Sequence, residues 1–168
     1  MATSFFTYVL FSILFTSTLV KGDLVIDVCI KTPVPSLCEK LLRSDPRSKT
    51  ADLETLGTIA FNMTSDLITS TSTMVEFLYD NATSTAMREL FRFCSSYYAY
   101  VEVCTENAIG YYKDKNYGQV VNFMTKSIDE VRLCDKSLRY KDENKNLKQA
   151  SLSLQQYFIA IIVIAIRL

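Results

Sequence analysis

The stretch CSSYYAYVEVCTENAIGYYKDKNYGQVVNFMTKSIDEVRLC, residues 94–134, starts and ends with cysteine and is interrupted near its middle by the polar connector KDKN. If the chain turns at Asp114, Cys94 and Cys134 each lie twenty residues from the turn, so two antiparallel helices bring them to the same level. Cys104 is ten residues nearer the turn. At ~1.5 Å per residue this displaces it by ~15 Å, against a Cα limit of ~7 Å for a disulfide. The stretch therefore predicts two paired helices, a Cys94–Cys134 disulfide and a buried free thiol at Cys104.

Four segments of the chain carry apolar residues at alternating steps of three and four, the pattern of a helix packed on one side. Asn116, with Gln119 three residues later, predicts a capping box at the start of the third segment. Short polar connectors separate the segments and place neighbouring helices antiparallel. The sequence thus predicts an all-α fold, an up-down-up-down four-helix bundle over residues 51–168. The segments span about 53–78, 87–111, 116–134 and 147–168.

The sequence also predicts features of the first and last of these helical segments. Asp52 and Glu54 are expected in the first turn of the first segment, where carboxylates favour the positive end of the helix dipole. The last segment contains the apolar run Tyr157–Ile166, which is too short to cross a bilayer and is expected to be a bundle helix buried on most sides. The buried seam of the first segment is expected to consist of Leu53, Leu56, Ala60, Met63, Leu67, Thr71, Met74 and Leu78.

Ahead of the bundle, residues 23–50 hold two short apolar pieces around the turn Thr32-Pro33-Val34-Pro35. A helical hairpin of this size cannot bury enough surface to be stable by itself. Cys29 and Cys38 flank the turn, so a local disulfide between them would close it. The sequence predicts two disulfides in all and one domain over residues 23–168, with this hairpin as its N-terminal extension.

The first 22 residues have the pattern of a secretory signal peptide. The apolar stretch Phe5–Val20 is followed by Lys21 and by the small residue Gly22, and the stretch is too short to span a bilayer comfortably. Cleavage after Gly22 would leave 146 residues, 168 minus 22. We therefore expect a secreted, extracellular protein with no membrane segment after cleavage, in a compartment that permits disulfides.

Composition excludes several kinds of function. The sequence has no His and only four Gly, which rules out Ser/His/Asp and Cys/His nucleophile pairs, His-based metal sites and the common phosphate-binding glycine loops. Lys plus Arg equals Asp plus Glu at 18 each, so no excess of positive charge attracts nucleic acid. A small hydrolase could use Glu102 and Glu106, but these lie one helical turn apart and are expected to be surface charges. We predict a non-enzyme with no metal, cofactor or catalytic residue.

Two N-glycosylation sequons occur, Asn62-Met63-Thr64 and Asn81-Ala82-Thr83. Asn81 lies in a predicted turn, and Asn62 lies off the apolar seam of its helix, so both side chains are expected at the surface. We therefore predict glycosylation at Asn62 and at Asn81.

Several residues together resemble one known family. They are the spacing of Cys29 and Cys38 with Thr32 and Pro35 between them, the stretch DPRSKTADL at 45–53, and Cys94 followed by Tyr98 and later by Cys134. With this pattern the mature chain resembles the plant invertase and pectin methylesterase inhibitor family, and the 45–53 stretch is most similar to its plane-tree pollen-allergen branch. The resemblance implies a four-helix bundle with an N-terminal hairpin, the same two disulfides and a location in the apoplast or cell wall. It also implies a one-to-one complex that blocks the active-site cleft of a carbohydrate-active enzyme.

The target enzyme stays open between pectin methylesterase and invertase. Invertase inhibitors of the family carry Pro-Lys-Phe just before the second bundle helix, where this chain has Thr85-Ala86-Met87. Pectin methylesterase inhibitors often have Thr before the cysteine that matches Cys134, where this chain has Leu133. They also tend to have Asp-Tyr at the start of the third bundle helix, where this chain has Asn116-Tyr117. A further alternative is an inhibitor fold without inhibitory activity.

Polar residues on the outer sides of the second and third bundle helices are the candidate contacts of an inhibitor. A disulfide-braced bundle loses little conformational entropy on docking, which suits this role. An alternative from another class is an extracellular protein that carries an apolar ligand between its helices. We expect a monomer whose partner is one of the two enzymes. The candidate partner-binding residues are Ser95, Ser96, Glu102, Glu106, Asn116, Lys126 and Asp129.

Overall fold

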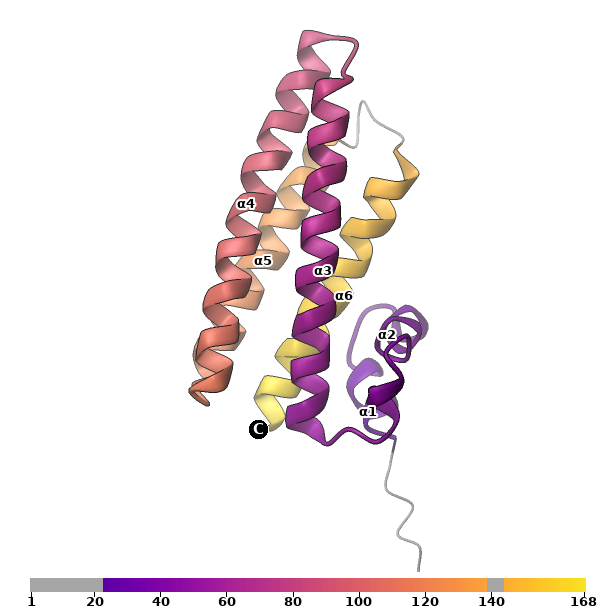
Figure 1. The fold of residues 1–168 in the computed structure, drawn as a ribbon, viewed down its shortest axis with the longest axis vertical. Helices are drawn as coiled ribbons and strands as arrows, with labels where there is room; N and C mark the ends of the chain where they lie inside the picture. Colours follow the sequence, from indigo (N-terminus) through magenta and orange to yellow (C-terminus); the bar gives the residue numbers. More distant parts are fainter. Residues whose placement is uncertain (1–22, 139–143) are drawn as a thin grey trace, which may run out of the picture.

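The computed structural model describes residues 23–138 and 144–168, and within them all regular structure is helical. The predicted signal peptide, residues 1–22, lies outside the described residues. Four long helices stand side by side, and two short ones pack beside one end of them (Figure 1). The elements in chain order are α1 (Leu24–Cys29), α2 (Pro35–Leu42), the 3-10 helix η1 (Pro46–Lys49), α3 (Leu53–Asp80), α4 (Thr85–Lys113), α5 (Tyr117–Leu138) and α6 (Lys145–Arg167).

The four long helices form the predicted up-down-up-down bundle. Each packs against the next in the chain, and α6 closes the bundle by packing against α3. The connectors from α3 to α4 and from α4 to α5 are only a few residues long, which makes the helices they join antiparallel. Because α6 packs against both α5 and α3, the helices α3 and α5 lie diagonally opposite each other, and Figure 1 shows α5 behind α4 and α3.

Each long helix begins where a short polar side chain accepts a hydrogen bond from a backbone N–H two or three positions into the helix. Asn116 Oδ1 accepts from Gln119 N at 3.4 Å, so the predicted cap of α5 is present. The other half of the predicted capping box differs, because Asn116 N donates to Tyr111 O at 2.8 Å and Gln119 Oε1 accepts from Asn122 Nδ2 at 3.3 Å. Asp52 differs from the expectation, since it is the cap of α3 itself and only Glu54 lies in the first turn. The capping residues are Asp52, Ser84, Asn116 and Asn144.

The buried side of α3 is centred about one residue away from the predicted seam. Leu53, Met63 and Leu67 are only half-buried, whereas Thr64 and Ile68 are almost fully buried. The reason is that α3 packs against two neighbours, α4 and α6, so apolar residues flank the most buried line on both sides. Thr64 occupies that line because its Oγ1 donates to Ala60 O at 2.7 Å, which satisfies the hydroxyl without water.

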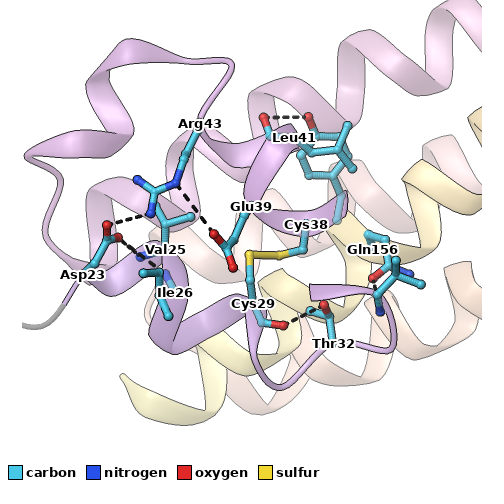
Figure 2. Close-up of a disulfide and its surroundings, with 12 residues drawn as sticks. Asp23, Val25, Ile26, Cys29, Thr32, Cys38, Glu39, Leu41, Arg43 and Gln156 are labelled. Carbon is cyan, nitrogen blue, oxygen red and sulfur yellow. Dashed lines mark hydrogen bonds and ion pairs between the residues drawn. A yellow bond between two sulfur atoms is a disulfide. The ribbon is translucent and has the colours of Figure 1, made fainter. Parts of the chain in front are cut away.

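The N-terminal hairpin is closed by the predicted disulfide, and it also contacts α6. The Cys29–Cys38 disulfide joins α1 to α2 with a Cα–Cα distance of 5.4 Å (Figure 2). Across the hairpin, Arg43 Nη2 lies 2.6 Å from Asp23 Oδ2, and this contact lowers the pKa of the Asp23 carboxyl. The backbone N–H of Val34 donates to the side-chain oxygen of the buried Gln156 at 3.2 Å, which ties the turn to α6.

Helix α6 is the core helix of the bundle. Among the described helices it is the one whose length and apolar composition would suffice to cross a membrane, but 56% of its most apolar window is buried inside the protein. Leu154, Phe158 and Ile161 are fully buried between the neighbouring helices. This confirms the expectation that the closing apolar run belongs to a buried bundle helix.

Candidate partner-binding surface

Helices α4 and α5 form a braced pair. The predicted Cys94–Cys134 disulfide is present, with a Cα–Cα distance of 4.8 Å. At the other end of the pair the chain turns through Lys115, whose φ of 57° is left-handed, and Asn116 N donates to Tyr111 O at 2.8 Å. The two helices are therefore fixed to each other at the turn and again twenty residues away from it.

One outward side of this pair exposes large apolar side chains. On α4, Phe93, Tyr100 and Val103 are 44%, 44% and 50% exposed, and their spacing of seven and three places them on one side of the helix. On α5, Leu133 is 42% exposed. Phe93 and Leu133 immediately precede the two bonded cysteines, so they lie at the same level of the pair. We call this surface the α4–α5 face; it consists of Phe93, Ser96, Tyr100 and Val103 on α4 and Lys126, Asp129, Glu130 and Leu133 on α5.

Beneath the middle of the α4–α5 face lies the free thiol of Cys104, buried as predicted. Burial raises the pKa of this thiol, and the charges of Lys126 and Glu130 on α5 also act on it. The Cys104 sulfur in turn raises the pKa of the Tyr100 hydroxyl. Tyr100 on α4 and Lys126 on α5 therefore both interact with the Cys104 thiol, although they come from two different helices.

Toward the turn, aromatic rings continue the contact between the two helices. Tyr111 on α4 and Phe123 on α5 stack with ring centroids 5.6 Å apart. Lys126 Nζ lies 5.1 Å from the centroid of Phe123, within the range of a cation–π contact. The lysine is thus positioned by a ring, which restricts a side chain that would otherwise be mobile.

The seven candidate residues from the sequence do not form one cluster. Ser96, Lys126 and Asp129 lie on the α4–α5 face, where Ser96 Oγ donates to Arg92 O at 3.2 Å. Asp129 Oδ1 pairs with Arg132 Nη1 at 3.9 Å. Asn116 caps α5 at the turn and so has a structural role.

The remaining three candidates lie on the other flank of α4. Ser95, Glu102 and Glu106 follow Arg88 at steps of seven, seven and four, so all four share one side of the helix. The guanidinium of Arg88 lies 6.0 Å from the ring centroid of Tyr79, which shows that this side borders α3. Ser95 is half-buried there, and Glu102 and Glu106 are exposed.

Sequence reasoning missed the apolar part of the α4–α5 face. It selected polar residues off the seam and treated large apolar residues as core. The signal that could have found Tyr100 and Val103 is their position, because neither belongs to the seam that runs through Cys94, Val101, Cys104 and Ala108.

A known protein family matches the chain from its N-terminal hairpin to its last helix. The family model of plant invertase/pectin methylesterase inhibitors matches residues 23–167. The chain belongs to this family. The resemblance inferred from the cysteine spacing is thereby confirmed.

Relatives within the invertase/pectin methylesterase inhibitor family include proteins named for each target. A pectinesterase inhibitor of Actinidia deliciosa is 28% identical over 172 residues, which cover 98% of this chain and 93% of that protein. A protein of Platanus acerifolia, named provisionally as an invertase inhibitor, is 26% identical over 135 residues, 77% of this chain and 75% of that protein. The chain is therefore similar to relatives whose names give different targets.

Solved structures of inhibitors of this family share the fold. A mutant form of a pectin methylesterase inhibitor from Arabidopsis matches with a TM-score of 0.78 at 19% identity, over 86% of this chain and 96% of the other. A pectin methylesterase inhibitor from Arabidopsis thaliana matches with a TM-score of 0.66 at 17% identity, over 86% of this chain and 95% of the other. At this identity the likeness establishes the all-helical fold and no more.

Proposed function

We propose that this protein is a secreted inhibitor that forms a one-to-one complex with a plant pectin methylesterase or invertase and covers its active-site cleft through the α4–α5 face. Membership of an inhibitor family supports the inhibitory role. The apolar stretch at 5–20 is compatible with a signal peptide, which supports secretion to the apoplast.

The observation that carries the choice of surface is the row of exposed apolar side chains on a rigid support. Binding energy in protein interfaces concentrates in a few anchor residues, most often Trp, Tyr or Arg, surrounded by contacts that exclude water. Tyr100 can serve as such an anchor, and Val103 and Leu133 can add apolar contact area beside it, since each of the three is at least 42% exposed in the free protein. The disulfide and the turn hold them in place beforehand, so little conformational entropy is lost on binding.

Two of the sites at which this sequence differs from the residue patterns of the family's inhibitors lie at the surface. Leu133 is on the α4–α5 face, and Thr85 and Ala86 are exposed in the first turn of α4. They can therefore change which enzyme is bound without disturbing the core. Of the two candidate targets we favour pectin methylesterase, because the Actinidia pectinesterase inhibitor is similar to this protein over 98% of this chain.

The test mixes the oxidised, secreted protein with a pectin methylesterase and, separately, with an invertase at apoplastic pH. Inhibition of one enzyme and co-elution of a one-to-one complex are expected. Full activity of both enzymes at micromolar excess of the protein would contradict the proposal.

The surface is tested with a pair of matched variants. Leu133→Asp places a charge on the α4–α5 face and should weaken inhibition at least about tenfold, which corresponds to about 1.4 kcal/mol. Phe77→Asp likewise replaces an exposed apolar side chain by a charge, at a residue that is 64% exposed on α3, away from that face, and should leave inhibition unchanged. Equal effects of the two variants would show that another surface binds the enzyme.

A further inference from the structure

Two exposed asparagines, one in α3 and one directly after it, lie outside the α4–α5 face. Asn62 is exposed within α3, and Asn81 is exposed immediately after the helix, where its Nδ2 donates to Phe77 O at 2.8 Å. Each is followed two residues later by threonine, in the order required for N-linked glycosylation. Both side chains meet the first requirement of a modification site, which is access from solvent.

We propose that Asn62 and Asn81 both carry N-linked glycans, so that α3 is the sugar-bearing side of the bundle. In the transfer step the side-chain nitrogen Nδ2 forms a bond to the anomeric carbon of a lipid-linked oligosaccharide. The bond from that carbon to the lipid pyrophosphate breaks, the pyrophosphate leaves, and Nδ2 loses one proton. This step requires the secretory route, so it rests on the proposed secretion but not on inhibition of any enzyme.

An independent feature near Asn81 supports a bulky group at this place. Phe77 is 64% exposed, so a large apolar side chain lies in solvent beside Asn81. Phe77 and Asn81 are four residues apart, so they lie on the same side of the helix end. A glycan on Asn81 would cover this ring. This would explain how an exposed phenylalanine is tolerated on the surface of a secreted protein.

The surroundings of Asn62 also suit a solvated, sugar-bearing side. No Lys or Arg occurs between Lys49 and Arg88, so α3 offers only acidic and neutral polar groups. Many of these are small hydroxyl residues that leave room for a glycan. The exposed polar residues of α3 are Glu54, Thr55, Thr58, Asn62, Asp66, Thr69, Ser70, Thr73, Glu76 and Asp80.

The two sites differ in when they can be modified. The hydroxyl of Thr64, which completes the Asn62 sequon, is fully buried and donates to Ala60 O at 2.7 Å. The Asn62 sequon can therefore be recognised only before α3 folds. Thr83, which completes the Asn81 sequon, is exposed in the connector after α3. Asn81 can consequently accept a glycan in the folded protein as well.

The glycans would also fix which side of the bundle remains open to a partner. Because α3 lies diagonally opposite α5, a glycan on Asn62 projects away from Lys126 and Leu133. The α4–α5 face is then the uncovered side, while the flank of α4 that borders α3, with Glu102 and Glu106, lies closer to the sugar.

Secretion of the full chain from a eukaryotic host, followed by N-glycosidase treatment and mass measurement, tests the assignment. The wild type should lose the mass of two glycans, and Asn62→Gln and Asn81→Gln should each lose the mass of one. Asn107→Gln is the matched control, because Asn107 is exposed, donates to Val103 O at 2.7 Å and is not part of a sequon. It should behave as the wild type. A secreted wild type whose mass loss is unchanged by Asn62→Gln or by Asn81→Gln would overturn the assignment of that residue.

A second measurement tests the timing. Unmodified protein that has been folded and oxidised is incubated with the transferase and a lipid-linked oligosaccharide. Modification at Asn81 alone is expected, and modification at Asn62 in protein that stays folded by circular dichroism would overturn the argument from Thr64. The secreted Asn62→Gln/Asn81→Gln protein should inhibit its target enzyme with unchanged potency. Absence of inhibition in all forms would reject the proposed function while leaving the mass result intact.

Discussion

Gly57 lies directly against the phenol ring of Tyr112. A Cβ added to Gly57 would be 2.6 Å from Tyr112 Cζ and closer still to Tyr112 Oη. The ring cannot easily move aside, since Tyr112 Oη donates to Glu54 O at 2.9 Å and the ring packs edge-on against Phe61. This contact joins the start of α3 to the end of α4, next to the turn that leads into α5.

Replacement of Gly57 by alanine should therefore destabilise the protein. Overpacking of this kind costs about 1–3 kcal/mol, because the tyrosine has to leave its hydrogen bond or α3 has to shift. Gly110→Ala is the control, since Gly110 is also helical but a Cβ added there would meet nothing within 4 Å. It should stabilise by about 0.5–1 kcal/mol through helix propensity. Urea denaturation of both variants measures the difference, and a Gly57→Ala protein as stable as Gly110→Ala would show that the ring moves freely.

The two disulfides should contribute unequally to stability. They close loops with sequence separations of 40 and 9 residues. In the chain-entropy description, loss of the longer loop costs about 4 kcal/mol and loss of the shorter about 2.5 kcal/mol. The double variants Cys94→Ala/Cys134→Ala and Cys29→Ala/Cys38→Ala, compared by their urea midpoints, check this order. A reversed order would mean that the hairpin disulfide acts mainly on the folded state.

The pairing of the cysteines could be predicted because helix geometry is regular. The rise per residue fixes how far Cys94, Cys104 and Cys134 lie from a turn, and the turn itself is visible as a polar connector. Helix type, order and approximate ends followed from the same periodicity. Asp52 shows the limit, because a cap and a first-turn residue differ by one position and favour the same side chains.

Other features depend on contacts between segments far apart in the chain. Thr64 has a polar side chain but is buried, because its hydroxyl donates a hydrogen bond to a backbone carbonyl of the same helix. Tyr100 has a largely apolar side chain but is 44% exposed, because α4 packs against helices on two sides and its third side faces solvent. Nothing in the sequence links Gly57 to Tyr112. Of the seven residues predicted as partner contacts, only Ser96, Lys126 and Asp129 therefore lie on the α4–α5 face, and their role in binding stays a prediction.

Docking of the N-terminal hairpin should depend on Gln156. The side chain is 2% exposed and its Oε1 accepts the Val34 N–H. Gln156→Leu keeps the volume but removes the acceptor, which should cost about 1–3 kcal/mol for the unsatisfied amide. Gln149→Leu, an exposed position on the same helix, should change stability by no more than about 0.5 kcal/mol. Hydrogen exchange should accelerate at Val34 in the first variant alone, and unchanged exchange there would show that another contact holds the turn.

Alkaline unfolding should reveal the buried tyrosines. Burial raises the pKa of Tyr157 to about 12, and it also raises the pKa values of Tyr98 and Tyr112. In the unfolded chain a tyrosine loses its proton near pH 10. Between pH 10 and about 12 the unfolded state therefore binds fewer protons than the native state, so the free energy of unfolding must fall as pH rises through this window.

For Tyr157 the contribution is fully present below pH 10 and is lost by about pH 12. Urea denaturation across this range should show a shallower decline in Tyr157→Phe than in the wild type, because the variant has one fewer proton to release. Below pH 10 the substitution should cost little, since Tyr157 Oη lies 3.5 Å from Leu41 O and its hydrogen bond there is weak. Parallel declines in the two proteins would show that Tyr157 ionises equally in the native and unfolded states.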